Sequence, residues 1–106
     1  MNKIMTEKQL EKAIREKATE LGYLTYKFTS PSNRGVPDRI FINPLGYIFF
    51  IEFKSKDGKL TALQKKVHED FGKRRVSVYV INDLDKGVKI LKILQDRKYI
   101  ALTNVN

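Results

Sequence analysis

The fold is decided by residues 35–54, which read Gly-Val-Pro-Asp-Arg-Ile-Phe-Ile-Asn-Pro-Leu-Gly-Tyr-Ile-Phe-Phe-Ile-Glu-Phe-Lys. Two apolar runs, at 40–42 and 47–53, flank the turn signal Pro-Leu-Gly at 44–46. Apolar runs joined by a short segment with Pro and Gly are typical of a β-hairpin. The stretch therefore predicts two antiparallel strands, the first beginning just after Asp38 and the second ending near Lys54.

The register of this hairpin determines where its charged residues lie. If Asn43 faces Tyr47 across the turn, antiparallel pairing places Asp38 opposite Glu52, with both side chains on one face of the sheet. Directly opposed residues have Cβ atoms about 5 Å apart, so the two carboxylates would repel each other. A hard divalent ion with oxygen ligands would offset this repulsion, and so would the ammonium of Lys54, which alternation returns to the same face. A slip of one residue would abolish the arrangement, so the prediction depends on the loop length.

Length and composition indicate an ordinary globular chain. It has 106 residues, and 42% of them are hydrophobic and 31% charged, which predicts one domain (1–106) with a modest core. No apolar stretch approaches the ~20 residues of a membrane span, and the first residues lack the apolar segment of a secretory signal. The absence of cysteine excludes disulfides and thiolate metal sites. We therefore expect a cytoplasmic protein with no membrane partner.

The charge balance indicates a polyanionic partner. The chain carries 21 Lys and Arg against 12 Asp and Glu, a net charge of +9. The excess is concentrated in residues 54–75, where eight basic and three acidic side chains leave +5. Nucleic acid is the leading candidate, and a lysine-rich surface that serves solubility is the alternative. The basic residues of this stretch are Lys54, Lys56, Lys59, Lys65, Lys66, Lys73, Arg74 and Arg75.

Capping signals and apolar periodicity predict three helices. Capping boxes formed by Thr6 with Gln9 and by Thr61 with Gln64 open the first two, which end at Gly22 and at Phe71 followed by Gly72. A last helix runs from a cap at Asp83 to about 96. The predicted core-facing residues are Leu10, Ile14, Ala18 and Leu21, then Leu60, Leu63, Val67 and Phe71, then Val88, Leu91 and Leu94 or Ile90 and Ile93.

The remaining apolar segments complete an α/β order. Residues 23–28 and 76–81 are rich in aromatic and β-branched residues and predict strands, and residues 97–102 are a candidate for a short edge strand. Both faces of the hairpin are apolar, so the sheet needs helices on both sides. The predicted order is α-β-β-β-α-β-α.

Two acids lie near the buried stripe of the first helix. Glu11 lies at the edge of the stripe, where it is either a solvated rim residue or part of a site. Glu7 lies on the same side one turn earlier, and there its charge interacts favourably with the helix dipole.

Three segments of the chain resemble a known family. They are Gly35-Val36-Pro37-Asp38, Ile51-Glu52-Phe53-Lys54 and the run from Gly58 to Gln64, Gly-Lys-Leu-Thr-Ala-Leu-Gln. Together they are similar to the motifs of the PD-(D/E)xK nuclease superfamily, and more narrowly of the VRR-NUC family in its stand-alone, phage-type form. The resemblance covers nearly the whole chain, from about Thr6 to the last helix. It implies a restriction-endonuclease-like core, in which a mixed β-sheet is flanked by helices.

The resemblance also implies a metal site. Asp38 and Glu52, with the backbone carbonyl of Phe53, would bind Mg²⁺ or Mn²⁺, and Glu11 would complete the site through a water on the ion. Phosphodiester cleavage needs charge neutralised on the scissile phosphate and hydroxide generated near neutral pH, and a carboxylate-held ion supplies both. Each metal ligand would also cancel part of the repulsion between the two acids.

Other candidate residues have two readings each. Lys54 would orient the attacking water or lower its pKa, or would only pair with the acids. Gln64 matches the family's helix glutamine, although its capping box alone explains it. The candidates for nucleic-acid contacts are Lys27, Ser30, Arg34, Lys56, Lys65 and His68. For Lys27, Ser30 and Arg34 the alternative is ordinary loop polarity. For His68 the alternative is a surface or packing role.

Two classes of function follow. The first is a divalent-metal-dependent, structure-specific DNA endonuclease, similar to Holliday-junction resolvases, that acts on branched DNA as a homodimer, in the host cytoplasm if the protein is viral. The second is a non-catalytic module that binds DNA through the basic stretch 54–75. A nuclease that acts on flaps, nicks or RNA is a further alternative to the first.

Overall fold

The computed structural model describes residues 4–99, and their element order is the predicted one. The elements are α1 (Glu7–Glu20), β1 (Leu24–Lys27), β2 (Arg39–Ile42), β3 (Ile48–Phe53), α2 (Ala62–Lys73), β4 (Val78–Ile81) and α3 (Leu84–Leu94). Of the candidate edge strand 97–102, only an isolated antiparallel bridge between Gly46 and Lys98 is present, and its last three residues lie outside the described part. Within residues 4–99 no helix is long and apolar enough to cross a membrane.

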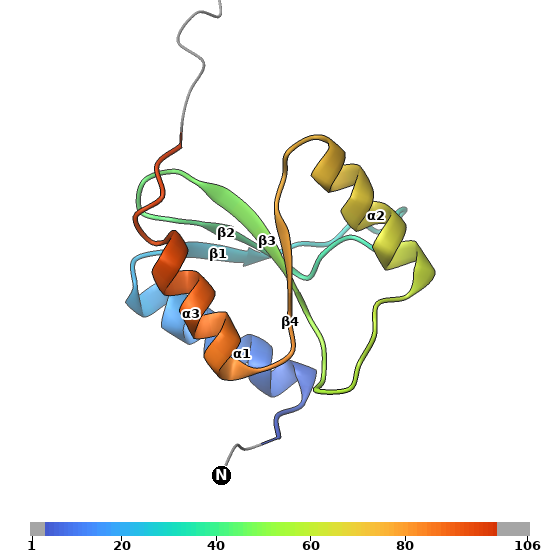
Figure 1. The fold of residues 1–106 in the computed structure, drawn as a ribbon, viewed down its shortest axis with the longest axis horizontal. Coiled ribbons are helices and arrows are strands. Elements are labelled where there is room, and N and C mark those ends of the chain that lie inside the picture. The colour runs from blue at the N-terminus through green and yellow to red at the C-terminus, as the bar shows by residue number, and fades with distance from the viewer. Residues whose placement is uncertain (1–3, 100–106) are drawn as a thin grey trace, which may run out of the picture.

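The four strands form one mixed sheet in the order β1-β2-β3-β4. The β1–β2 and β2–β3 pairs are antiparallel, whereas β3 and β4 are parallel. A parallel pair needs a crossover connection, and α2 supplies it. α2 lies on one side of the sheet, and α1 and α3 lie side by side on the other (Figure 1). The predicted α/β fold with helices on both faces is therefore confirmed.

The hairpin has the register that the sequence required. Arg39 pairs with Ile51 and Ile42 with Ile48, and the Asn43 N–H donates to the Tyr47 carbonyl at 2.9 Å. The buried Asn43 side chain sets the turn, because its Oδ1 accepts from the backbone N–H groups of Leu45 and Tyr47 at 2.9 and 2.8 Å. The loop length on which the prediction depended is thus fixed by one asparagine.

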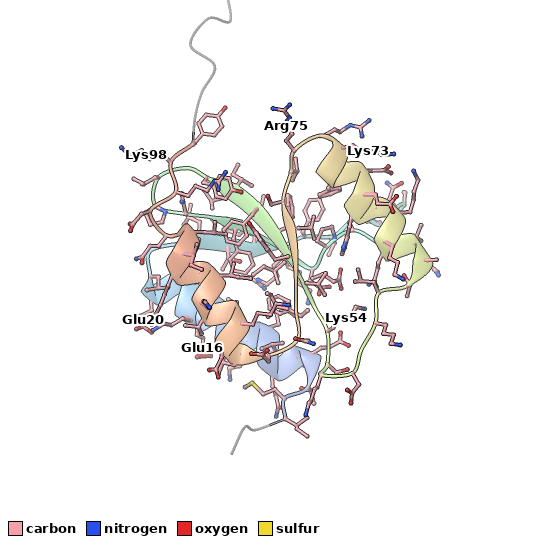
Figure 2. The ribbon with its side chains drawn as sticks, viewed as in Figure 1. Glu16, Glu20, Lys54, Lys73, Arg75 and Lys98 are labelled. Carbon is pink, nitrogen blue, oxygen red and sulfur yellow. The ribbon has the colours of Figure 1, made fainter. Side chains whose placement is uncertain are left out.

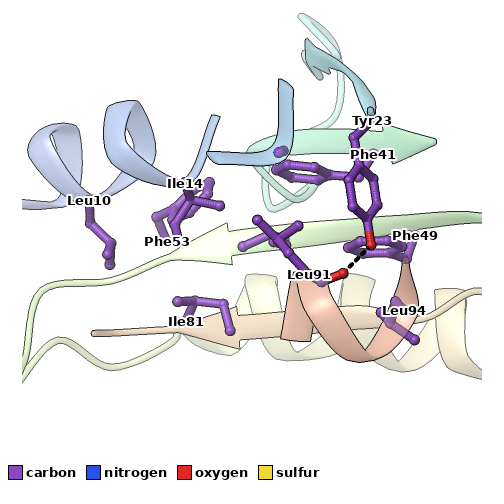
Figure 3. Packing of buried hydrophobic residues seen from close by; sticks show 11 residues of the cluster. Leu10, Ile14, Tyr23, Phe41, Phe49, Phe53, Ile81, Leu91 and Leu94 are labelled. Carbon is purple, nitrogen blue, oxygen red and sulfur yellow. Dashed lines mark hydrogen bonds between the residues drawn. The ribbon is translucent and has the colours of Figure 1, made fainter. Parts of the chain in front are cut away.

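The main core lies between the sheet and the α1–α3 pair. Phe41, Phe49, Ile51 and Phe53 point to this side and are at most 1% exposed. The hydroxyl of Tyr23 crosses the core and donates to the carbonyl of Leu91 at 2.6 Å (Figure 3). In α3 the buried residues are Gly87, Leu91 and Leu94, whereas Ile93 is 65% exposed, which decides between the two predicted faces of that helix.

The α2 side of the sheet is more thinly covered. Phe50 packs edge-on against Phe71 of α2 and against Phe28, but α2 has no fully buried residue. The prediction that Leu63 belongs to the core is wrong, since this residue is 48% exposed. Leu63 packs beside Gly35, in the loop that precedes β2, instead of on the sheet. α2 also continues past the predicted stop at Phe71, and the left-handed residue that follows it is Arg75, at φ 62°.

Candidate active site

Asp38 and Glu52 meet at the end of the hairpin on the α2 side. The Asp38 N–H donates to the Ile51 carbonyl at 3.1 Å, although Ile51 is the ladder partner of Arg39, so the backbone leaves the regular β2–β3 register at Asp38. Asp38 Oδ2 accepts from the Phe53 N–H at 2.7 Å, so the carboxylate is tied to β3. Glu52 is only 2% exposed. The two acids therefore lie close together, although Asp38 precedes β2 and is not part of the regular β2–β3 ladder.

The two carboxylates disfavour each other's charge. Burial raises the pKa of Glu52 to about 8, and the charge of Asp38 and side-chain hydrogen bonding with it act in the same direction. The ammonium of Lys54 opposes this rise but lies 3.9 Å from Glu52 Oε2, beyond hydrogen-bond distance. Figure 2 shows Lys54 where the chain leaves β3 toward α2. The charge of Lys54 alone therefore offsets only part of the repulsion between Asp38 and Glu52.

Gln64 forms the predicted capping box and also contacts Glu52. Its Oε1 accepts from the Thr61 N–H at 2.9 Å and its own N–H donates to Thr61 Oγ1 at 3.1 Å, which completes the capping box. Its Nε2 donates to Glu52 Oε2 at 3.3 Å. Because the cap uses the amide oxygen, the amide nitrogen is directed to the carboxylate. The cap of α2 therefore also orients Glu52.

His68 lies one turn further along α2, beside the same carboxylate. Its Nε2 is 3.6 Å from Glu52 Oε1, and both atoms are buried without a hydrogen-bond partner. Burial lowers the pKa of His68, which favours the neutral imidazole. The sequence proposed a phosphate contact or a packing role for this residue. The structure instead places it against a buried oxygen that has no partner.

The donor set fits a small divalent cation. A buried carboxylate oxygen without a partner is unfavourable unless an ion or a water satisfies it. No group of three or more His, Cys, Asp or Glu side chains within residues 4–99 is arranged to hold a metal. Mg²⁺ does not require such a cage, since it is commonly held by one or two carboxylates and keeps several waters. Asp38 and Glu52 supply oxygen ligands of this kind, so the residues present are compatible with Mg²⁺ or Mn²⁺.

Glu11 is not brought to these acids. Its Oε2 lies 3.2 Å from Arg39 Nη1 and 4.0 Å from Lys27 Nζ, and Arg39 Nε donates to Thr25 Oγ1 at 3.2 Å. Arg39 is the first residue of β2 and reaches Glu11 of α1, whereas the charge of Asp38 acts on Glu52 and on His68 of α2. Glu11 is therefore neutralised on the α1 side of the sheet, whereas Asp38 points to the α2 side.

Glu7 is the α1 acid whose charge acts on the site. It contributes to the raised pKa of Glu52, as the weakest of the causes. The sequence offered only a helix-dipole role for Glu7, although its place one turn before Glu11 on the same side of the helix was visible. The sequence could not show where the start of α1 lies relative to the hairpin.

The candidates for nucleic-acid contacts do not gather in one place. Lys27 lies at the end of β1 on the α1 side, and Ser30 Oγ accepts from Asn33 Nδ2 at 3.1 Å within the loop that follows. Arg34, Lys56 and Lys65 are exposed. Lys73 and Arg75 lie at the opposite end of α2 from Lys54 (Figure 2). The basic stretch 54–75 therefore does not form a single patch around the acids.

The loop before Asp38 is held against α2 by a glycine. Gly35 has φ 90°, and a Cβ at this position would lie 3.0 Å from the Leu63 carbonyl oxygen and 3.1 Å from Val67 Cγ2. Only glycine combines this backbone conformation with so close an approach. Pro37 is fully buried and leads into Asp38. The Gly-x-Pro-Asp sequence is thus the local device that delivers the acid to the hairpin.

Known proteins that are similar to this chain include a solved domain and a phage protein. No protein-family model matches the chain. A solved structure described as a VRR_NUC domain is 30% identical, covers 90% of this chain and 100% of its own, and has a TM-score of 0.72. A protein named "Putative nuclease p44", from Acyrthosiphon pisum secondary endosymbiont phage 1, is 38% identical over 66 residues, which are 62% of this chain and 71% of the relative. The chain belongs to the VRR_NUC family.

Proposed function

We propose that this chain is a divalent-metal-dependent endonuclease that hydrolyses phosphodiester bonds in DNA. The observation that carries the proposal is the closeness of Asp38 to the buried Glu52, which has one carboxylate oxygen without a partner. Burial, and after it the charge of Asp38, raises the pKa of Glu52 to about 8. Membership of the VRR_NUC family and the similarity to a phage protein named as a nuclease support it.

Each residue of the site has a proposed role. Asp38, Glu52 and the backbone carbonyl of Phe53 would hold Mg²⁺ or Mn²⁺. The bound ion would neutralise charge on the scissile phosphate and supply hydroxide near neutral pH. Lys54 donates to a phosphate oxygen or holds the attacking water, since its ammonium lies beside Glu52. Gln64 keeps the Glu52 carboxylate in place through the contact at 3.3 Å.

The residues around the two acids also have proposed roles. His68 is directed at Glu52, so in this proposal it steadies the charged carboxylate instead of reaching a distant phosphate. Ser30, Arg34, Lys56 and Lys65 remain candidates for phosphate contacts. Glu11 is not included among the metal ligands because Arg39 and Lys27 already engage it.

The finer parts of the function rest on the family resemblance. We propose that the chain acts as one nuclease domain and that its DNA is branched, as for Holliday-junction resolvases. The site is built within one chain, so cutting two strands together requires two copies, and a symmetric homodimer meets this requirement. For a phage-type enzyme the place of action is the host cytoplasm.

Cleavage of a substrate panel tests the proposal. Labelled duplex, flap and four-way DNA, with an RNA duplex beside them, are incubated with the protein in Mn²⁺ or in EDTA. We expect cleavage of branched DNA in Mn²⁺ only. The Asp38→Asn variant should lose about 100-fold or more in rate. Asp85→Asn, which makes the same chemical change at an exposed acid in α3, should retain the wild-type rate.

Several results would overturn or redirect the proposal. DNA binding that survives EDTA, with no cleavage and no stabilisation by Mn²⁺, would identify a non-catalytic DNA-binding module. Cleavage restricted to RNA would assign a different substrate. A monomer by light scattering, in the presence of four-way DNA, would contradict paired cutting.

A further inference from the structure

A second charged surface lies on the α1 side of the sheet, away from the two acids. It is a groove of about 490 Å³ between α1 and the ends of β1 and β2. Its charged lining residues are Lys8, Glu11, Lys12, Arg15, Lys27 and Arg39. Five of these are basic and one is acidic, a net charge of +4. The groove is therefore strongly positive, whereas the opposite face carries the carboxylate pair.

The floor of the groove is a fixed arginine. Arg39 is 8% exposed, and its guanidinium is held by Glu11 at 3.2 Å and by Thr25 at 3.2 Å. A guanidinium has five N–H donors in a rigid fork, and these two contacts use only some of them. The head group is thus oriented before any ligand arrives.

The rim of the groove is a row of exposed cations. Lys8, Lys12 and Arg15 are spaced three and four residues apart, so they lie on one side of α1. The row extends about 10 Å along the helix axis. Lys27 is exposed on the β1 side, and its ammonium lies 4.0 Å from Glu11, the only acid among the charged lining residues. A row of this length can contact more than one phosphate of a nucleic-acid backbone.

The groove begins at the same end of the sheet as the carboxylate site. Arg39 and Asp38 are consecutive, with Cα atoms about 3.8 Å apart. Arg39 contacts Glu11 of α1, whereas the charge of Asp38 acts on Glu52 and on His68 of α2. A nucleic-acid strand bound at Asp38 therefore reaches the groove by passing over the end of β2. Of the residues that line this groove, only Lys27 was among the candidates for nucleic-acid contacts in the sequence, and none of the α1 cations was.

We propose that this groove binds the sugar-phosphate backbone of nucleic acid beyond the phosphate that the carboxylate site cleaves. Glu11 is a positioning residue in this arrangement, because it orients Arg39 and limits the positive charge of the groove. The inference rests on the proposed function for the identity of the ligand, but the binding it describes needs no metal.

Paired lysine variants test the groove. The measurement is the affinity for a fluorescein-labelled duplex DNA in EDTA, followed by anisotropy over a series of KCl concentrations. Lys8→Gln with Lys12→Gln should weaken binding near physiological salt about 5-fold for each phosphate that α1 no longer neutralises, and should reduce the salt slope by about 0.9 per phosphate. The matched control is Lys89→Gln with Lys92→Gln, two exposed lysines of α3 that should leave affinity and slope nearly unchanged. Equal weakening in both variants would show a response to net charge only and overturn the proposal.

A substitution of Glu11 should change the affinity for DNA in the opposite direction. Glu11→Gln removes the acid that opposes phosphate, so affinity in EDTA should rise by up to about 5-fold and the salt slope should steepen. Unchanged affinity in EDTA, together with a weaker dependence of cleavage on Mn²⁺, would place Glu11 at the metal site and overturn its role in the groove. Thermal unfolding of each variant establishes that it is folded.

The two proposals can fail separately. If wild-type protein does not cleave in Mn²⁺ but the α1 variant still binds more weakly than the α3 control, the groove stands and the nuclease proposal fails. If wild-type protein cleaves branched DNA but the α1 and α3 variants bind alike, the groove proposal fails alone.

Discussion

The two faces of the sheet at the start of β2 carry opposite excesses of charge, although the residues that carry them are neighbours in the sequence. On the α2 side, Asp38 and the buried Glu52 meet, and the nearest cation, Lys54, stays 3.9 Å away from Glu52. On the α1 side, one acid, Glu11, is engaged by Arg39 at 3.2 Å and by Lys27 at 4.0 Å. The first arrangement is short of positive charge and the second has it in excess.

This difference explains why a cation is expected at one face only. A buried acid with a neighbouring acid is stabilised by protonation or by a bound cation, whereas an acid already paired with a guanidinium gains little from either. The two cases are separated because Arg39 contacts Glu11 of α1, whereas Asp38 acts on Glu52 and on His68 of α2. We therefore expect a metal ion and a phosphate backbone to bind on opposite sides of the start of β2.

The largest expected contrast is between Glu52→Gln and Glu11→Gln. Glu52→Gln should lower cleavage in Mn²⁺ about 100-fold or more yet raise the Tm in EDTA, because it replaces an acid whose charge is disfavoured. Glu11→Gln should lower the Tm in EDTA, because Arg39 loses its counter-charge. Cleavage rates in Mn²⁺ and thermal unfolding in EDTA test the expected changes in rate and in Tm. A Glu52→Gln variant that melts below wild type in EDTA would contradict the account of the acid pair.

The next contrast separates the two roles of Gln64. Thr61→Ala and Gln64→Ala each remove one member of the capping box and should each lower the free energy of unfolding by about 1 kcal/mol. Only Gln64→Ala also removes the contact to Glu52, so it alone should reduce cleavage by about 10–100-fold. Denaturant unfolding and single-turnover cleavage measure the two effects. Equal cleavage rates in the two variants would restrict Gln64 to the cap.

A smaller effect is expected within the α1 side. Arg39→Gln should lower the free energy of unfolding by about 1–3 kcal/mol, because it removes a largely buried charged hydrogen bond to Glu11. Lys27→Gln should change it by less than about 0.5 kcal/mol, because its ion pair with Glu11 is long and largely exposed. Urea unfolding of both variants compares them. The same destabilisation in each would show that burial does not distinguish the two cations.

The last contrast concerns the pH dependence of stability without metal. The pKa of Glu52 is raised from 4.5 to about 8, so the folded state retains a proton that the unfolded state releases between these values. Stability from this group is present below about 4.5 and is lost as pH rises toward 8 and above. The lowered pKa of His68 acts in the other direction, below about 6.5.

Thermal unfolding in EDTA between pH 6.5 and 8.5 isolates the Glu52 contribution. We expect a fall of a few degrees in Tm over this range, which Glu52→Gln abolishes. Mn²⁺ should raise the Tm more at the upper end, where it no longer competes with the proton. A Tm that rises with pH in EDTA, or an equal gain from Mn²⁺ at both ends, would contradict the raised pKa.

Local signals were sufficient for most of the fold. The capping boxes at Thr6 and Thr61 form as the sequence requires, because their partners lie three residues apart. The hairpin register followed from the turn, where Asn43 bonds to residues two and four positions away. Motifs close in sequence likewise placed Asp38 close to Glu52.

Errors arose where two distant elements dock. The sequence could not show that Leu63 packs on Gly35 at the rim and stays half exposed. It also could not show that His68 reaches Glu52, since that contact depends on how α2 lies over the sheet. Helical periodicity reports which side of a helix is apolar, but not which neighbour that side meets.

The sequence by itself determined the order of the elements, the hairpin register and the closeness of two acids, because these follow from hydrogen bonds and alternation among residues near one another in the chain. The tertiary structure alone decided that Glu11 belongs with Arg39 instead of with Asp38. The physical reason is that residue 39 points to the face that α1 covers, and only the docking of α1 on that face brings Glu11, 28 residues away, to its guanidinium.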